Sequence, residues 1–175
     1  MSSPLPASPT PTVPSFRSRP SQAVLWGGLI AGAWDISFAF VYYGLRNHAT
    51  IQGVLQSVAG GLIGRAASRA GGWSTALLGL ACHFVIALGA AAVYVALHRR
   101  LPALDRSAVV SGLLYGGVVY FVMNWLVMPL SAYHAKLFAT PDAWAVLAHM
   151  IGVGVPIALA TRRFAPGARE SGNRA

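Results

Sequence analysis

Four long apolar stretches dominate this chain and determine the solvent in which it can fold. They cover about residues 23–45, 73–97, 109–128 and 143–160. Each reaches the length of about 20 residues that a helix needs to cross the hydrocarbon core of a bilayer. Only 10% of the residues are charged, whereas about a quarter are charged in ordinary soluble domains. The sequence therefore predicts an all-α integral membrane bundle of four transmembrane helices.

A fifth segment, about residues 51–70, is shorter. Its apolar part runs for about 14 residues before Arg65 and Arg69, which is too short for a full crossing. On a helical wheel an apolar ridge (Ile51, Val54, Leu55, Val58, Leu62) lies opposite a strip of small residues (Gly53, Ser57, Gly60, Gly64). We predict a short re-entrant or interfacial helix, with the small strip against the bundle and the ridge toward lipid.

The basic residues give this bundle an orientation. The 13 Lys and Arg, part of a net charge of +9, lie between and beyond the apolar stretches. With four crossings, one side holds Arg17, Arg19, Arg99, Arg100, Arg106, Arg162, Arg163, Arg169 and Arg174, and the other holds Arg46, Arg65, Arg69 and Lys136. This nine-to-four split predicts cytoplasmic N- and C-termini, and a fifth crossing would reverse it. Such loop charges favour the lipid bilayer as partner and speak against nucleic acid.

The two ends of the chain differ from the apolar part. Residues 1–22 contain six prolines with many Ser and Thr, a composition that cannot build a core. We expect a disordered cytoplasmic tail there, a transmembrane domain over residues 23–163, and a short polar tail over residues 164–175.

Each apolar stretch carries one conspicuous polar side chain: Asp35, His83, Asn124 and His149. Polar groups inside lipid are costly and therefore face the bundle interior. All four stand on helix faces made of small residues, where helices approach closely. We expect them to converge in one polar layer, in the half of the bundle away from the termini.

Three interpretations of this layer stay open. The four side chains can serve only as hydrogen-bonding groups that stabilise the bundle. Alternatively, Asp35 accepts a proton or cation and His83 and His149 relay it, as in a site for a proton, an ion or a small substrate. The two histidines are also possible ligands of haem or a metal. They lack a dense ligand cluster such as His-x-x-x-His, so we expect no metal and no cofactor.

Three Gly-x-x-x-Gly motifs occur, at Gly28–Gly32, Gly60–Gly64 and Gly112–Gly116. We expect these glycines to pack helices within one copy of the chain. No Gly-x-Ser-x-Gly elbow, His-Glu-x-x-His pair or phosphate-binding loop is present. The sequence therefore favours a non-enzymatic membrane component that assembles with itself or with a membrane-protein partner. The alternative is a small transporter or ion-coupled component that uses the polar layer.

Several phrases of the sequence carry a family resemblance. They are Gly32-Ala33-Trp34-Asp35, Val54-Leu55-Gln56-Ser57-Val58-Ala59-Gly60-Gly61, Gly79-Leu80-Ala81-Cys82-His83-Phe84 and Met123-Asn124-Trp125-Leu126-Val127-Met128-Pro129-Leu130-Ser131. With them the chain, from about residue 25 to 160, resembles a group of small bacterial inner-membrane proteins. The resemblance implies a four-helix protein of the bacterial inner membrane, and it brings no known activity and no mapped site.

Overall fold

A computed structural model describes residues 19–134, 136, 138 and 140–165. Its α-helices are α1 (Pro20–Asn47), α2 (Ile51–Ile63), α3 (Arg65–Ala70), α4 (Gly72–Arg100), α5 (Ala108–Val122), α6 (Met128–Leu130), α7 (Ala143–Ala148) and α8 (Val155–Phe164). Between them lie the 3-10 turn η1 (Pro102–Asp105) and the π-helical segments η2 (Met123–Val127) and η3 (His149–Gly154). No strand occurs among the described residues, so the expected all-α fold is confirmed.

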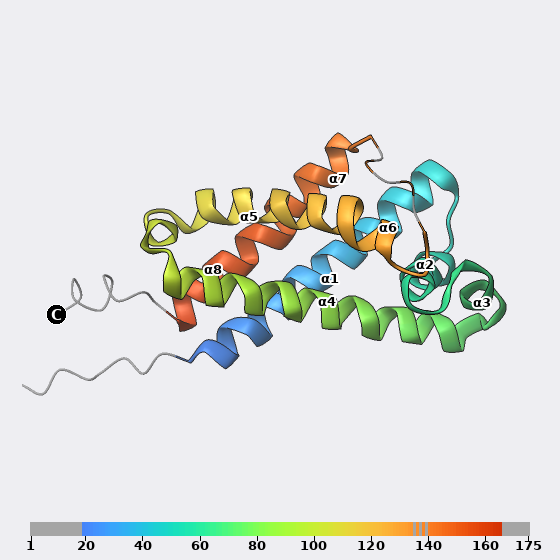
Figure 1. Cartoon of the computed structure of the whole chain (residues 1–175), viewed down its shortest axis with the longest axis horizontal. Coiled ribbons are helices and arrows are strands. Elements are labelled where there is room, and N and C mark those ends of the chain that lie inside the picture. The colour runs from blue at the N-terminus through green and yellow to red at the C-terminus, as the bar shows by residue number, and fades with distance from the viewer. Residues whose placement is uncertain (1–18, 135, 137, 139, 166–175) are drawn as a thin grey trace, which may run out of the picture.

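Four rods of this structure are long and apolar enough to cross a membrane: α1, α4, α5–η2–α6 and α7–η3–α8. Successive rods run in opposite directions along the long axis of the molecule, so both described ends of the chain lie at one end of the bundle (Figure 1). There the backbone N–H of Arg19 donates a hydrogen bond of 2.7 Å to the carbonyl of Phe164. The chain is thus a multi-pass membrane protein.

The interior of the bundle is built from small residues. The main core cluster contains Ala31, Ala91, Ala108 and Ala158, with Tyr94, Val153 and Ile157 as its larger members. Large apolar side chains such as Leu45, Leu114 and Leu130 are instead 66–79% exposed. In water this distribution would be unfavourable, but lipid solvates large apolar groups and small residues let helices approach closely. The fold therefore has the side-chain distribution that a bilayer requires.

Local sequence signals account for where the helices begin and end. Pro20 lies in the first turn of α1, where its missing N–H costs nothing. The side chains of Thr50, Ser107 and Asp142 accept hydrogen bonds from backbone N–H groups in the first turns of α2, α5 and α7. These caps satisfy donors that have no partner within their helices. Pro102 follows the end of α4.

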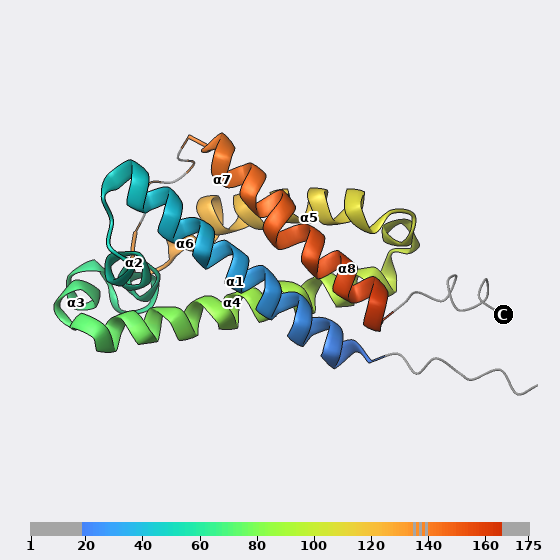
Figure 2. The ribbon, with the colours of Figure 1, turned by 180° about the vertical axis from the view of Figure 1, so that it is seen from behind.

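The short helix of residues 51–70 is broken in two. Gly64 has a φ of +84° and separates α2 from α3, a backbone conformation that glycine adopts without steric cost. At 13 residues, α2 is too short to cross a bilayer. It is seen nearly end-on in Figures 1 and 2, so it lies across the rods, at the end of the bundle opposite the termini.

The side of α2 that faces the bundle differs in part from our expectation. In the middle of the apolar ridge Val54 and Leu55 are buried, whereas Ile51 and Leu62 at its ends are exposed as expected. Of the small strip, Gly60 is buried and Gly53 and Ser57 are exposed. The cause lies on α4, where a Cβ atom at Gly79 would stand 1.9 Å from the Leu55 carbonyl oxygen. The glycine that allows close approach is on α4, and the ridge of α2 packs against it.

The glycines of the three motifs lie in three different environments. A Cβ atom would stand 2.9 Å from the Leu88 Cα at Gly28, and 3.1 Å from the Ala87 Cβ at Gly32. At Gly112 and Gly116 it would stand 2.8 Å and 2.2 Å from carbonyl oxygens of Gly154 and His149. At Gly60 the nearest atom would belong to the Tyr133 ring, at 3.0 Å. Four of the six thus lie in contacts between rods of one chain, α1 with α4 and α5 with η3.

The expected tails fall mostly outside the described part of the chain. Residues 1–18 and 166–175 are not described, and residues 20–22 and 164 belong to helices α1 and α8. The four rods also extend a few residues beyond the expected limits, to 20–47, 72–100, 108–130 and 143–164. Apolar periodicity marks the lipid-embedded part, and the helices continue into the polar margins on either side.

Candidate functional site

Asp35 and His149 meet inside the bundle. Asp35 lies on α1, and His149 is the first residue of the π-helical segment η3. The Nε2 atom of His149 is 3.6 Å from Oδ1 of Asp35, and the two side chains are only 18% and 23% exposed. This distance suits an ion pair but exceeds a hydrogen bond. Single π-helical turns inside α-helices are frequent at functional sites.

The other ring nitrogen of His149 makes a hydrogen bond within its own rod. Nδ1 lies 2.8 Å from the backbone carbonyl of Ala145, and a carbonyl oxygen can only accept, so Nδ1 carries a hydrogen. In a neutral ring, Nε2 would then present a lone pair to Asp35. An ionised carboxylate and a neutral Nε2 would repel each other. Nε2 is therefore the ring atom that faces the carboxyl group of Asp35, and a proton on either group would remove this repulsion.

His83 contributes a third polar group from α4. Its Nε2 atom donates to the carbonyl of Gly32 at 2.9 Å, because that oxygen can only accept. Nδ1 is left as the nitrogen that can meet a ligand. Gly32 lies one helical turn before Asp35, so this bond ties His83 to the same part of α1.

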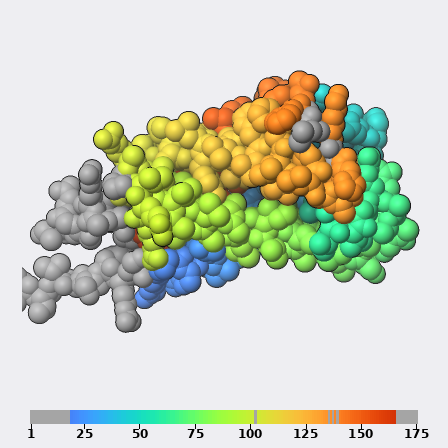
Figure 3. Space-filling model, viewed as in Figure 1, coloured from blue at the N-terminus to red at the C-terminus, as the bar shows by residue number. Residues whose placement is uncertain are grey.

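Asp35, His83 and His149 line one pocket, which we call the Asp35 pocket. Its remaining walls are mostly apolar side chains from α1, α2, α4, α5, η2 and η3, and its volume is about 540 Å³. Figure 3 shows a hollow between α4 and the α5–η2 rod on this face of the molecule. Small-molecule sites in proteins are typically apolar clefts of 300–1,000 Å³ with a few convergent polar groups. The Asp35 pocket has this form.

Asn124 does not join these three residues. Its side-chain amide donates to the carbonyl of Tyr120, one turn earlier in the same rod, at 2.9 Å. It is not among the residues that line the Asp35 pocket. Asn124 lies in the π-helical segment η2, whose altered turn moves side chains away from the positions of a regular helix. A helical wheel drawn from the sequence could not anticipate this.

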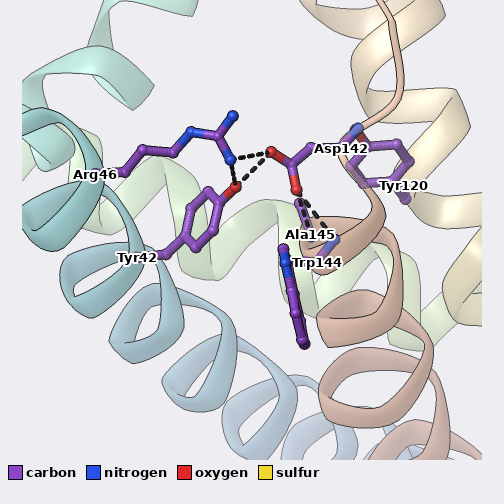
Figure 4. A network of polar contacts seen from close by, with 6 residues as sticks. All are labelled: Tyr42, Arg46, Tyr120, Asp142, Trp144 and Ala145. Carbon is purple, nitrogen blue, oxygen red and sulfur yellow. Dashed lines mark hydrogen bonds and ion pairs between the residues drawn. The ribbon is translucent and has the colours of Figure 1, made fainter.

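A second polar cluster lies at the end of the bundle opposite the termini (Figure 4). Tyr42 on α1 donates a hydrogen bond to Oδ2 of Asp142, and Arg46 donates to the Tyr42 hydroxyl. Arg46 also forms a 3.1 Å ion pair with Asp142. The backbone N–H of Asp142 donates to the Tyr120 hydroxyl at 2.9 Å. This Asp142 cluster joins α1, α5 and the start of α7.

Hydrogen bonding sets the protonation of Asp142. The Tyr42 hydroxyl, then the backbone N–H groups of Ala145 and Trp144, and the charge of Arg46 hold the pKa of this carboxyl below its usual value. Partial burial opposes them. All four groups favour the ionised form, so Asp142 is a carboxylate at neutral pH.

The Asp142 cluster is connected to the Asp35 pocket through Tyr120. The Tyr120 ring packs edge-to-face against the His149 ring, with 5.3 Å between centroids. The sequence could have identified Asp142 as a helix cap, because it directly precedes an apolar run. No sequence pattern indicated that Tyr42 and Arg46 contact Asp142, because they lie about 100 positions earlier and meet it only in the folded chain.

A further buried pair lies at the end of the bundle where both termini lie. His98, in the last turn of α4, donates from Nε2 to Asp105 in η1 at 2.6 Å, and its side chain is 4% exposed. Its Nδ1 atom has no hydrogen-bond partner in the described part of the chain. The sequence analysis does not single out this pair, because His98 and Asp105 lie outside the four apolar stretches.

The described residues contain no group of three or more His, Cys, Asp or Glu side chains arranged to hold a metal ion. Comparison with known proteins gives no match to a family model, to a curated protein or to a solved structure. The resemblance to small bacterial inner-membrane proteins therefore stays a prediction, and any function must be argued from the site itself.

Proposed function

We propose that this chain is a small transporter, or a component of one, that binds a proton together with an amphipathic solute in the Asp35 pocket. Asp35 and His149 hold the proton, and His83 contacts the polar part of the solute. The observation that carries the proposal is the contact of Asp35 with Nε2 of His149 at the edge of an apolar pocket. Ionisable residues inside a membrane commonly mark proton or substrate pathways.

The small number of carboxylates makes the proton site directly observable. The sequence has four acidic residues, Asp35, Asp105, Asp142 and Glu170, and only Asp35 lies within a described membrane-spanning rod. Infrared difference spectra of the protein in lipid nanodiscs, recorded between two pH values, should contain a carboxyl or imidazolium signal from the Asp35–His149 pair. The ring part of this signal should shift when histidine is labelled with nitrogen-15.

The matched variants are Asp35→Asn, His149→Gln and Asp105→Asn. The first two should each abolish the signal, because each removes one member of the pair. Asp105→Asn removes the carboxylate of the His98 pair, so it should leave the Asp35 signal in place. A signal that persists in Asp35→Asn would overturn the proposal, as would unchanged proton uptake by the Asp35→Asn, His83→Ala double variant.

The second candidate is a non-enzymatic component that assembles with itself or with a partner protein. Small-residue faces that a partner helix could contact favour it. Gly28 and Gly32 instead contact α4, and Gly112 and Gly116 contact η3, all within one chain. These faces are occupied, so we rank assembly second. Native mass spectrometry after release from the membrane would favour it if the chain emerged as a defined oligomer or with a bound partner.

We also propose the bacterial inner membrane as location, with both termini in the cytoplasm. The nine-to-four split of basic residues and the resemblance described above support this. Reporter fusions after Arg99 and after Arg163 should both report the cytoplasmic side. Reporters on opposite sides would contradict the topology.

A further inference from the structure

The rods α4 and α5 follow each other in sequence but hardly meet. α4 packs against α1 and α2, while α5 packs against η3 and α8. Between α4 and α5 remains a groove of about 750 Å³, lined by apolar side chains such as Val93 and Leu97 of α4 and Leu114 and Val118 of α5. We call it the α4–α5 groove. An apolar space of this kind is unfavourable for water.

Two polar bridges join α4 to α5 at the groove. The Tyr115 hydroxyl donates to the carbonyl of Ala90 at 2.6 Å, and Tyr94 and Ser111 share a hydrogen bond of 2.8 Å. A helix with its side chains is about 10 Å wide. Such a helix could pass between α4 and α5 only by breaking these bonds. The bridges favour a slender hydrocarbon chain as occupant.

One end of the groove carries a positive charge. Arg106 lines it in the loop between α4 and α5, at the end of the bundle where both termini lie. The Arg106 side chain has no ion-pair partner among the described residues. A guanidinium at the margin of an apolar groove complements a phosphate whose attached chains lie in the membrane.

The other end of the groove adjoins the Asp35 pocket. The two cavities share the lining residues Ile86, Ala90, Val119 and Met123. The groove and the Asp35 pocket are therefore neighbours between α4 and the α5–η2 rod.

We propose that the α4–α5 groove binds one anionic glycerophospholipid, with its phosphate at Arg106 and one acyl chain along the groove toward the Asp35 pocket. Lipid binding at this site does not depend on proton binding by Asp35. It adds a specific ligand to the general contact that any membrane protein has with lipid.

Photoactivatable lipids test this site. The protein is placed in phosphatidylcholine nanodiscs with a small fraction of a phospholipid that carries a diazirine in its acyl chain. The headgroup of this probe is either phosphatidylglycerol or phosphatidylcholine. After illumination, cross-linked peptides are identified by mass spectrometry. We expect cross-links concentrated on the groove faces of α4 and α5, with about a fivefold preference for phosphatidylglycerol, the size expected for one arginine at a membrane surface.

Two pairs of variants separate the headgroup contact from the chain contact. Arg106→Gln should remove the preference for phosphatidylglycerol, whereas Arg99→Gln, at the end of α4 but not lining the groove, should keep it. Val93→Trp should fill the groove and lower cross-linking of both probes. Val41→Trp, at a similarly exposed position on α1, should leave it unchanged.

Three results would overturn the proposal. The first is cross-linking spread evenly over the outer faces of α1 and α8. The second is an equal yield for the two headgroups in the unaltered protein. The third is an absence of cross-links on the groove faces of α4 and α5, the result expected if a second chain occupies the groove. If Val93→Trp fails to fold, the Arg106 and Arg99 variants still decide the outcome.

Discussion

The two sides of α5 differ in how closely its neighbours approach. On one side α5 meets η3 through glycines, and a Cβ atom at Gly154 would stand 1.8 Å from the Gly112 carbonyl oxygen. On the other side Leu114 and Val118 face α4 across the groove. In lipid there is no hydrophobic force to close such a groove, so helices pack where small residues permit backbone contact. Side-chain size along one helix therefore decides which neighbour is bound tightly and which gap stays open to lipid.

The largest effect should follow from adding a side chain where α5 packs closely against η3. Gly116→Ala would place a Cβ atom 2.2 Å from the His149 carbonyl oxygen, and overpacking of this kind costs about 1–3 kcal/mol. We expect a clear loss of thermal stability in detergent, measured by circular dichroism, together with loss of the Asp35–His149 infrared signal. Gly117→Ala is the control, since its nearest neighbour would be the Met150 Cγ at 3.7 Å. Equal stability of the two variants would contradict the packing described.

A smaller effect should follow from removing the side chain of Asp142, which caps α7, the helix that leads into η3. Asp142→Ala removes the side-chain acceptor for the N–H groups of Trp144 and Ala145, and loss of such a cap costs about 1 kcal/mol. Asp142→Asn can keep the cap through its one amide oxygen, but it loses the charge and the second oxygen, which accepts from Tyr42 and Arg46. It should therefore cost less, because an exposed ion pair such as that with Arg46 contributes little. Denaturation of both variants in detergent measures the difference.

The same residue should make stability depend on pH. The pKa of Asp142 is lowered in the folded protein from its usual value of 3.8, so folding favours the ionised carboxyl. Its contribution is complete well above pH 4 and is lost as the pH falls through the lowered pKa. The acid-induced loss of stability should be shallower in Asp142→Asn than in the unaltered protein. Parallel curves would show that Asp142 does not contribute to it.

The smallest effect should follow from a change on the side of α5 that faces the α4–α5 groove. Tyr115→Phe removes the hydrogen bond to Ala90 that bridges the groove, and such bonds between membrane helices contribute about 0.6 kcal/mol on average. We expect a small loss of stability and greater lipid cross-linking within the groove. Tyr133→Phe is the control, because its hydroxyl makes no hydrogen bond to any described residue in this structure. An unchanged groove in Tyr115→Phe would show that the bridge does not limit its width.

The sequence alone determined the solvent, the number of crossings and the alternating course of the chain. Stretches of about 20 apolar residues have one low-energy solution in lipid, a helix that satisfies its own backbone hydrogen bonds. The sequence also identified Asp35, His83 and His149 as candidates, because ionisable groups are rare in such stretches and differ from their neighbours.

Only the tertiary structure decided which polar groups meet. Asn124 and His149 both lie in π-helical turns, yet one bonds within its own rod and the other reaches Asp35. The side of α2 that is buried depended on Gly79, a residue of another helix. The Asp142 cluster and the α4–α5 groove join parts of the chain that no local pattern relates. Contacts of this kind depend on the distances between helices, and a helical period carries no information about those distances.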